Sequence, residues 1–459
     1  MVFSSVMFLF YFLPIILFIY FICPKKYRNY VLLFFSLLFY FIGEPINVVF
    51  LILSCFINYY GSVLIHKKKI KNIKKMIFIG IISYNIIQLL IFKYSNFFIE
   101  NLNYIPFVDI PLLNILMPIG ISFYTFQAIS YVSDVYIGKV KPAKNIFTFM
   151  TYLTLFPQLI AGPIVRYETI ENDLKDRSIK FDNVSNGLKL FIIGLSKKVL
   201  LANVLGELIN KFVVETVVSS WMKPILYTLQ IYFDFSGYSD MAIGLGLVFG
   251  FNFLQNFNYP LIAKSITDFW RRWHMSLSSF FRDYVYIPLG GNRVSKPKWI
   301  RNIFVVWFLT GFWHGASWNF ILWGVYFGVI LLIEKFLIGK YLEKTKVFKH
   351  VYTLIIVVIS FLIFSTDNMS DIFNSLGNMF FLNKLDFINN ETIYYLKDYF
   401  MILIISIISC TPLFKNIYLK YKDNKIISFM EPIILLGLFI LCVAFIIDAS
   451  FNPFLYFRF

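Results

Sequence analysis

Long apolar stretches follow one another along this chain, with short polar segments between them. The first runs from Val2 to Cys23, and others cover about 30–42, 47–65, 76–93 and 112–137. Because a helix that crosses a bilayer needs about 20 apolar residues, these stretches predict a series of membrane-spanning helices. No basic residue precedes the first stretch and no small-residue cleavage site ends it, so we expect a retained span and not a signal peptide.

The polar segments alternate in charge. Basic residues without acidic neighbours gather at 25–28, 66–75 and 139–144, whereas the segment 366–399 has five acidic residues and two lysines. Basic loops stay preferentially on the cytoplasmic side of a membrane. The pattern therefore places the basic segments inside and the acidic segment outside a membrane that the chain crosses several times.

The central part of the chain differs from its two ends. Proline, glycine and charged residues interrupt the apolar stretches around 156–163, 234–240 and 264–301. Backbone that is not helical is tolerated at membrane depth only where it is buried in protein or lines a cavity. We therefore expect the functional site in this central part.

Composition agrees with a membrane protein. Of 459 residues, 59% are hydrophobic and 15% are charged, with a mean hydropathy of +0.72, whereas a soluble domain has about 25% charged residues. A soluble domain, a disordered chain and a disulfide scaffold are excluded, and the length accommodates roughly ten or more spans. The sequence predicts an all-α polytopic membrane protein with one domain, divided into N-terminal spans (1–145), a central core with broken, re-entrant and amphipathic helices where we expect the site (146–340), and C-terminal spans (341–459).

The net charge of +17 would suggest nucleic-acid binding in a soluble protein. Here the basic loops account for it, and we expect the lipid bilayer and no nucleic acid as a partner. The four cysteines have no paired spacing, so neither a disulfide framework nor a metal site is indicated. The signatures HExxH, Walker A, GxSxG and CxxC are absent from the sequence, which leaves a metalloprotease, a pump ATPase and a serine hydrolase without support.

His314 is the first candidate for chemistry. It lies in a run of 30 residues, Ile303 to Leu332, without Lys, Arg, Asp or Glu. An ionisable group at such depth indicates a functional site. The alternative is a histidine that only hydrogen-bonds another helix, and we favour function.

The neighbours of His314 suggest how its surroundings are built. If the run is one helix, Thr310 and Ser317 lie on the same face as His314 and form a narrow polar stripe. Gly311 and Gly315 would then admit either a neighbouring helix or a narrow substrate close to the imidazole.

His274 lies in a second candidate segment, Ser265–Tyr284, whose apolar residues recur at helical spacing. Ser265 and Asp268 resemble a capping box, so the segment predicts one amphipathic helix. His274 lies at the edge of its apolar face, and Arg271 and Arg272 lie nearer the polar face. These arginines either extend to the membrane interface or bind the phosphates of an activated donor.

Acidic residues also interrupt apolar stretches elsewhere in the chain. Asp234 and Asp240 either line the cavity or mark a helix break near an interface, and Asp134 is placed similarly in an earlier segment. For all three we favour structural roles.

Several motifs closely resemble the membrane-bound O-acyltransferase (MBOAT) family, and within it the branch of bacterial alginate O-acetyltransferases and relatives that act on other polysaccharides. The similarity runs nearly from end to end. It is carried by Met1–Ser5, Gly162–Tyr167, Phe233–Asp240, Phe269–Ser278, Phe281–Arg293, Gly311–Asn319 and Asn452–Phe459.

This resemblance implies a ring of membrane helices around a tunnel, with His314 as the catalytic histidine and His274 at a second polar position. It implies no metal and no tightly bound cofactor. Acetyl from cytosolic acetyl-CoA would pass to hydroxyl groups of an exported or cell-surface polysaccharide, either directly or through an extracytoplasmic acetyltransferase partner.

The chemistry of the residues agrees with this expectation. A neutral imidazole that accepts the proton of an attacking hydroxyl contributes about 10²–10⁴-fold to a rate, and His314 is our candidate base. His274 or Asn319 would donate to the oxyanion, and we predict Asn319, Arg271, Arg272 and Ser317 as substrate-binding residues. The rival functions are D-alanyl or lipid acyl transfer by another branch of the family, or non-enzymatic polysaccharide export.

Overall fold

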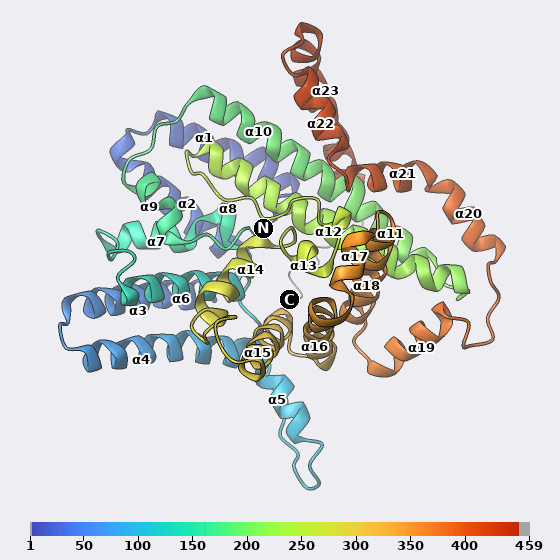
Figure 1. The fold of residues 1–459 in the computed structure, drawn as a ribbon. Coiled ribbons are helices and arrows are strands. Elements are labelled where there is room, and N and C mark those ends of the chain that lie inside the picture. Colours follow the sequence, from blue (N-terminus) through green and yellow to red (C-terminus); the bar gives the residue numbers. More distant parts are fainter. Residues whose placement is uncertain (1, 161, 449–459) are drawn as a thin grey trace. The chain divides into compact units, whose positions relative to one another are not determined.

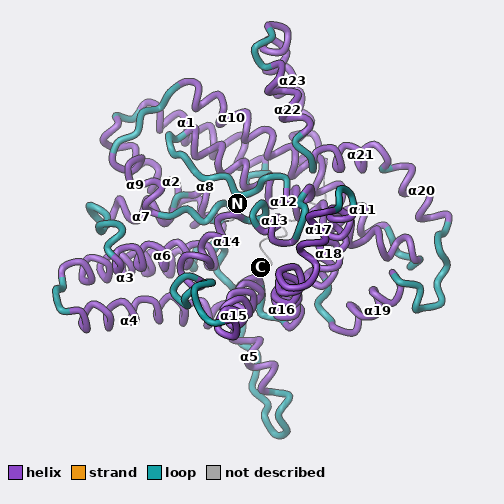
Figure 2. Tube along the Cα trace, in the orientation of Figure 1, coloured by secondary structure: helices purple, strands orange, loops and turns teal. Residues whose placement is uncertain are grey.

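The computed structural model describes residues 2–160 and 162–448, and in this part of the chain the regular elements are helices without a strand (Figure 1, Figure 2). The predicted all-α fold class is confirmed. The chain divides into two compact units, one with residues 1–191 and 241–254 and the other with 192–240 and 255–459. Met1 and the motif Asn452–Phe459 lie outside the described residues.

The described residues of the first unit form the helices α1 to α10 and the end of α12, and α3, α4 and α6 pack against one another (Figure 1). Short π-helical or 3₁₀ turns at Phe8–Phe12, Lys25–Tyr27 and Leu90–Tyr94 join some of them. The bounds are α1 Leu13–Ile22, α2 Arg28–Gly43, α3 Val48–Lys67, α4 Lys71–Leu89, α5 Ser95–Leu102, α6 Ile121–Ile137, α7 Ile146–Thr154, α8 Phe156–Leu159, α9 Tyr167–Lys175 and α10 Phe181–Ser196, the last of which continues into the second unit.

Polar side chains in the first unit join neighbouring helices. Asn58 of α3 and Asn85 of α4 are fully buried and exchange two amide hydrogen bonds, of 2.7 and 3.2 Å. Such a pair satisfies polar groups that would otherwise be buried without partners between membrane helices. These polar residues therefore have structural roles in continuous helices.

The second unit contains the segment that the sequence marked as irregular. Its helices are α11 Val204–Lys211, α12 Val217–Val248, α13 Ile266–Trp270, α14 Met275–Phe281, α15 Lys296–His314, α16 Trp318–Ile333, α17 Gly339–Lys344, α18 Phe348–Ser365, α19 Met369–Met379, α20 Asn390–Asp398, α21 Phe400–Ser409, α22 Leu413–Tyr421 and α23 Lys425–Asp448, with α12 ending in the first unit. Shorter π-helical or 3₁₀ turns lie at Lys197–Asn203, Pro260–Ile262, Arg282–Tyr286 and Glu334–Ile338.

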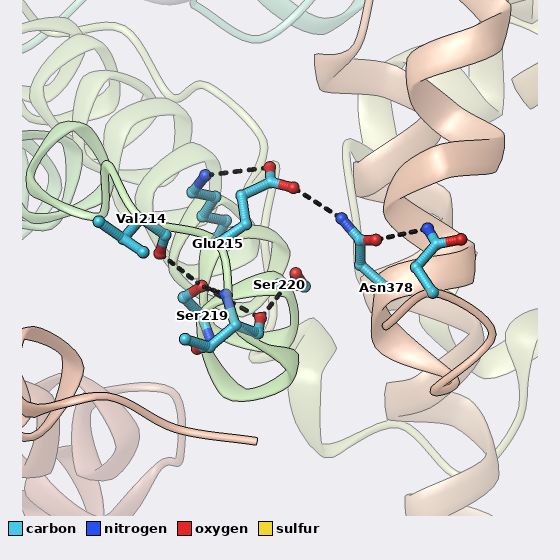
Figure 3. A network of polar contacts seen from close by, with 8 residues as sticks. Val214, Glu215, Ser219, Ser220 and Asn378 are labelled. Atoms are coloured by element: carbon cyan, nitrogen blue, oxygen red, sulfur yellow. Dashed lines mark hydrogen bonds and ion pairs between the residues drawn. The ribbon is translucent and has the colours of Figure 1, made fainter. Parts of the chain in front are cut away.

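A polar network joins the beginning of α12 to the end of α19 and to the segment that follows it (Figure 3). Glu215 accepts a 2.6 Å hydrogen bond from the amide of Asn378, whose own oxygen accepts from Asn383 at 2.6 Å. The main-chain N–H groups of Val217 and Val218 donate to carbonyls of residues 386 and 387, each at 3.0 Å. The predicted outer segment 366–399 is thus partly ordered by its contacts with α12.

Five helical stretches of the described residues are long and apolar enough to cross a membrane, or six if the bent pair α20–α21 is one span. They are Val48–Lys67, Lys71–Leu102, Trp318–Lys344, Phe348–Ser365 and Lys425–Asp448. This count is lower than the roughly ten spans predicted from length, because much of the apolar sequence lies in shorter or interrupted helices. The expected span 112–137 is one example, since it is helical only from Ile121, after Pro118 and a left-handed Gly120 with φ 75°.

The run through His314 is not one helix, so the condition for a polar stripe of Thr310, His314 and Ser317 is not met. Helix α15 ends at His314, Gly315 is extended, and α16 begins at Trp318. The two helices pack against each other as a hairpin. Glycine at position 311 permits this close approach, because a Cβ there would collide with the carbonyl oxygen of Phe320 on α16. Thr310 therefore shares the helix of His314, whereas Ser317 does not.

The prediction of one helix over 265–284 is also wrong. The side chain of Ser265 caps α13 by accepting from the N–H of Asp268 at 3.0 Å, as the sequence indicated. The helix then ends at Trp270, and α14 begins only after His274, whose φ of 42° lies in the left-handed region. A left-handed residue interrupts a right-handed helix, so His274 lies at a break and not on a continuous amphipathic face.

The alternative of a helix break at 234–240 is wrong, because α12 is continuous through this segment. Asp234 pairs with Lys198 at 2.5 Å, and both side chains are at most 3% exposed. Asp240 pairs with Lys197 at 2.6 Å, and these side chains are 21 to 24% exposed. Two ion pairs therefore account for the two aspartates on this helix.

Candidate active site

His314 ends α15 in an aromatic environment within the second unit. Its ring centroid lies 4.9 Å from that of Trp313, 5.0 Å from that of Trp323 and 5.2 Å from that of Phe364. The ring planes meet His314 nearly at right angles, at 74 to 80°, which is a favourable edge-to-face arrangement. His314 is 3% exposed, so rings from α15, α16 and α18 hold a buried imidazole.

Glycine contacts explain how α15 and α16 approach so closely beside His314. Gly311 faces the main chain of Phe320 and Gly324, and Gly315 faces the ring of Phe320. Of the two roles predicted for these glycines, the structure therefore shows the admission of a neighbouring helix.

His274 is fully buried at the break between α13 and α14. Its Nδ1 lies 3.2 Å from the side-chain oxygen of Asn256. The ring contacts Phe235 of α12, with centroids 4.7 Å apart, and lies 6.0 Å from the ring of Trp313. Since Trp313 also contacts His314, the structure brings the two predicted histidines to one tryptophan.

Burial lowers the pKa of His274 to about 3, because the charged imidazolium loses its hydration. Burial therefore favours the neutral form of its ring.

Asn319 is fully buried at the beginning of α16. Its amide nitrogen donates to the carbonyl of Phe364 at 3.2 Å and to that of Ile363 at 3.4 Å. These bonds join α16 to the end of α18, beside the Phe364 ring that contacts His314. The described hydrogen bonds of its amide group are thus to main-chain carbonyls. Ser317 is the N-cap residue of the same helix and is half-buried.

The two predicted arginines differ in their surroundings. Arg272 donates to Asp268 at 2.9 Å and to the carbonyl of Asn258 at 3.3 Å. Arg271 is exposed. Arg272 thus has an acidic partner on α13, the helix that precedes it, and a role of either residue in binding phosphates stays a prediction.

Glu334 supports α13 from the end of α16, and sequence reasoning missed it. One carboxylate oxygen accepts from the N–H of Ile266 at 2.6 Å, and the other accepts from the N–H and the hydroxyl of Thr267, each at 3.2 Å. With the Ser265 cap, the first three N–H groups of α13 are satisfied. An acidic residue directly after a long uncharged run was the available signal for Glu334.

Asn256 and Lys198 were also missed. Lys198 follows Lys197 inside an apolar stretch, and this intrusion is a signal of the same kind. Asn256 is one of several asparagines in a loop, and nothing in its spacing distinguishes it from Asn252 or Asn258.

Comparison with known proteins gives a consistent result. The model of the membrane-bound O-acyltransferase family matches residues 142–370. The probable alginate O-acetylase AlgI of Pseudomonas aeruginosa is 42% identical over 385 residues, which cover 80% of this chain and 73% of that protein. The peptidoglycan O-acetyltransferase of Helicobacter pylori is 32% identical over an alignment of 523 residues that covers 100% of this chain and 98% of that protein.

A third relative is more distant. The teichoic acid D-alanyltransferase of Bacillus subtilis is 31% identical over 242 residues, which cover 49% of this chain and 60% of that protein. The predicted family resemblance, the polytopic membrane fold and the acyltransferase class are confirmed. This chain belongs to the membrane-bound O-acyltransferase family and is an acyltransferase of the membrane.

Proposed function

We propose that this protein transfers acetyl groups from cytosolic acetyl-CoA to hydroxyl groups of an exported or cell-surface polysaccharide, in a bacterial cytoplasmic membrane. The acetyl group reaches the polymer directly or through an extracytoplasmic acetyltransferase partner. Similarity over most of the chain to relatives named for O-acetylation of alginate and of peptidoglycan supports this proposal.

The observation that carries the proposed mechanism is the burial of His314 among aromatic rings. A hydroxyl group is a weak nucleophile, and an imidazole within hydrogen-bond reach activates it by accepting its proton. As the hydroxyl oxygen forms a bond to the thioester carbon, its proton passes to His314. When the C–S bond breaks, the same proton passes to the departing thiolate.

The aromatic neighbours of His314 contribute to selectivity for an alcohol over water. Trp313, Trp323 and Phe364 present apolar surface to the imidazole. A reaction site from which water is excluded suppresses hydrolysis of a reactive thioester. Exposed Arg271 is available to the phosphates of the donor, as an arginine fork pairs well with them.

Teichoic acid D-alanylation is the second candidate function. The D-alanyltransferase of Bacillus subtilis matches 49% of this chain, whereas the two O-acetylating relatives match 80% and 100%. The wider coverage favours acetyl over D-alanyl transfer.

The test is the variant His314→Ala in the native host, with His66→Ala as the control because His66 is exposed on α3. Surface O-acetyl ester per sugar is measured together with the amount of polymer. We expect the ester to be lost in His314→Ala while the polymer amount is unchanged, and both to be normal in His66→Ala. Retained acetyl ester in a correctly inserted His314→Ala protein would refute the proposal, and loss of D-alanine ester instead would support the second candidate.

A further inference from the structure

The side chain of Asn256 accepts hydrogen bonds beside His274. Its oxygen accepts from the N–H of Ser276 at 3.1 Å and from the hydroxyl of Ser276 at 2.9 Å, and it lies 3.2 Å from Nδ1 of His274. The main-chain carbonyl of Asn256 also accepts from the N–H of Met275 at 2.9 Å. Asn256 thus caps the beginning of α14 and contacts the histidine at the same time.

These contacts determine which amide atom faces His274. The oxygen and nitrogen of an asparagine amide are assigned from the hydrogen bonds around them. A main-chain N–H is always a donor, so the atom of Asn256 that faces the N–H of Ser276 has to be the oxygen. The same oxygen faces Nδ1 of His274.

The tautomer of His274 follows from the identity of that atom. If Nδ1 had no proton, its lone pair would face the lone pairs of the amide oxygen at 3.2 Å. The hydroxyl of Ser276 is a poorer partner for such a lone pair, since it lies 3.4 Å from Nδ1 and 2.9 Å from the amide oxygen. A proton on Nδ1 removes the repulsion and forms a hydrogen bond. In a neutral imidazole, Nε2 is then an acceptor.

We propose that Asn256 is a positioning residue that holds His274 in the Nδ1–H tautomer, so that Nε2 of His274 accepts a hydrogen bond from an O–H or N–H group of a substrate. This inference rests on the proposed acyl transfer for the presence of a substrate at the two histidines. It revises the sequence-based expectation for His274, because an acceptor nitrogen stabilises a hydroxyl or amide donor and not an oxyanion.

The backbone at His274 agrees with a residue that is held in place by its surroundings. A φ of 42° is unusual for a residue other than glycine. Residues in this region persist when neighbouring contacts fix them. The capping of α14 by Asn256 and the edge-to-face contact with Phe235 are such contacts.

The test reads the tautomer directly, by ¹⁵N and ¹³C nuclear magnetic resonance of histidine-labelled full-length protein in lipid bilayers at pH 7. The variant His274→Gln identifies the signals of His274. We expect Nδ1 to be protonated in the wild type and in Asn256→Asp, where a carboxylate replaces the amide acceptor. In Asn256→Ala we expect the Nε2–H form to appear. Asn258→Ala is the matched control, since the side chain of Asn258 is exposed and its main chain pairs with Arg272.

An activity measurement separates this inference from the proposed function. We expect Asn256→Ala to lower the rate of acetyl transfer about tenfold, which is the size of effect that the loss of one buried hydrogen bond produces. Asn256→Asp should retain more activity, because its carboxylate still accepts a hydrogen bond. His314→Ala should abolish transfer without changing the tautomer of His274. An Nε2–H form in the wild type, or an unchanged spectrum in a folded Asn256→Ala protein, would overturn the inference even if acetyl transfer is confirmed. Acetyl transfer that survives His314→Ala would overturn the proposed mechanism and leave the tautomer result standing.

Discussion

The two buried histidines of the second unit contact the same tryptophan but are held in different ways. His314 ends a helix of 19 residues, and the rings of Trp313, Trp323 and Phe364 surround it. His274 lies at a break between two short helices, and its Nδ1 contacts the amide oxygen of Asn256. Rings from three helices thus pack around the first histidine, whereas the second lies at a helix break beside a hydrogen-bonded asparagine.

This difference determines which changes each histidine tolerates. A close-packed helix pair responds to added volume, since protein interiors have little spare space. A hydrogen-bonded break responds to the loss of a donor or acceptor, since an unmade buried hydrogen bond costs about 1–3 kcal/mol. Substitutions that add side-chain volume should therefore perturb His314, and substitutions that remove a hydrogen-bond donor or acceptor should perturb His274.

The largest difference is expected between the variants His314→Gln and His274→Gln. Glutamine cannot act as a base near neutral pH, so His314→Gln should lose about 10²–10⁴-fold in acetyl transfer. His274→Gln keeps a side chain with an acceptor oxygen and should lose about tenfold. Initial rates of acetyl transfer in membrane vesicles measure both. Equal losses in the two variants would contradict the assignment of different roles.

A smaller effect is expected from added volume beside His314. Gly311→Ala places a methyl group against the main chain of Phe320, which cannot yield as a flexible side chain does. Overpacking of this kind costs about 1–3 kcal/mol, and we expect a lower thermal midpoint in detergent together with reduced transfer.

The matched control for this variant is Gly437→Ala in α23. A Cβ at Gly437 meets nothing within 4 Å. Alanine favours helix by about 1 kcal/mol over glycine, so Gly437→Ala should leave the thermal midpoint unchanged or raise it. An equal decrease in both variants would show that the contact between α15 and α16 does not limit stability.

The sequence predicted the fold class, because hydropathy is a local property. It also singled out both histidines as candidates, because an ionisable residue in an apolar stretch is visible locally, and their catalytic roles stay a prediction. It did not predict the helix breaks at Gly315 and His274. Apolar residues recur at helical spacing on both sides of each break, and the breaks depend on contacts that only the folded chain makes, such as Phe320 packing on Gly311 and Asn256 capping α14. Asn256 was missed for the same reason, since its role exists only once the loop has folded onto α14.

The smallest effect is expected where hydrogen bonds to Glu334 hold α13, the helix that leads to His274. Glu334→Ala removes the acceptor for the N–H groups of Ile266 and Thr267. The loss of a helix cap costs about 0.5–2 kcal/mol, so we expect a modest decrease in thermal midpoint. Glu334→Gln keeps one acceptor oxygen and should decrease it less. Glu343→Ala is the control because Glu343 is exposed on α17.

In the labelled protein, Glu334→Ala should shift the resonances of His274 more than those of His314, because α13 continues into the segment of His274. A larger shift at His314 would show that Glu334 supports the packed helix pair and not the hydrogen-bonded break.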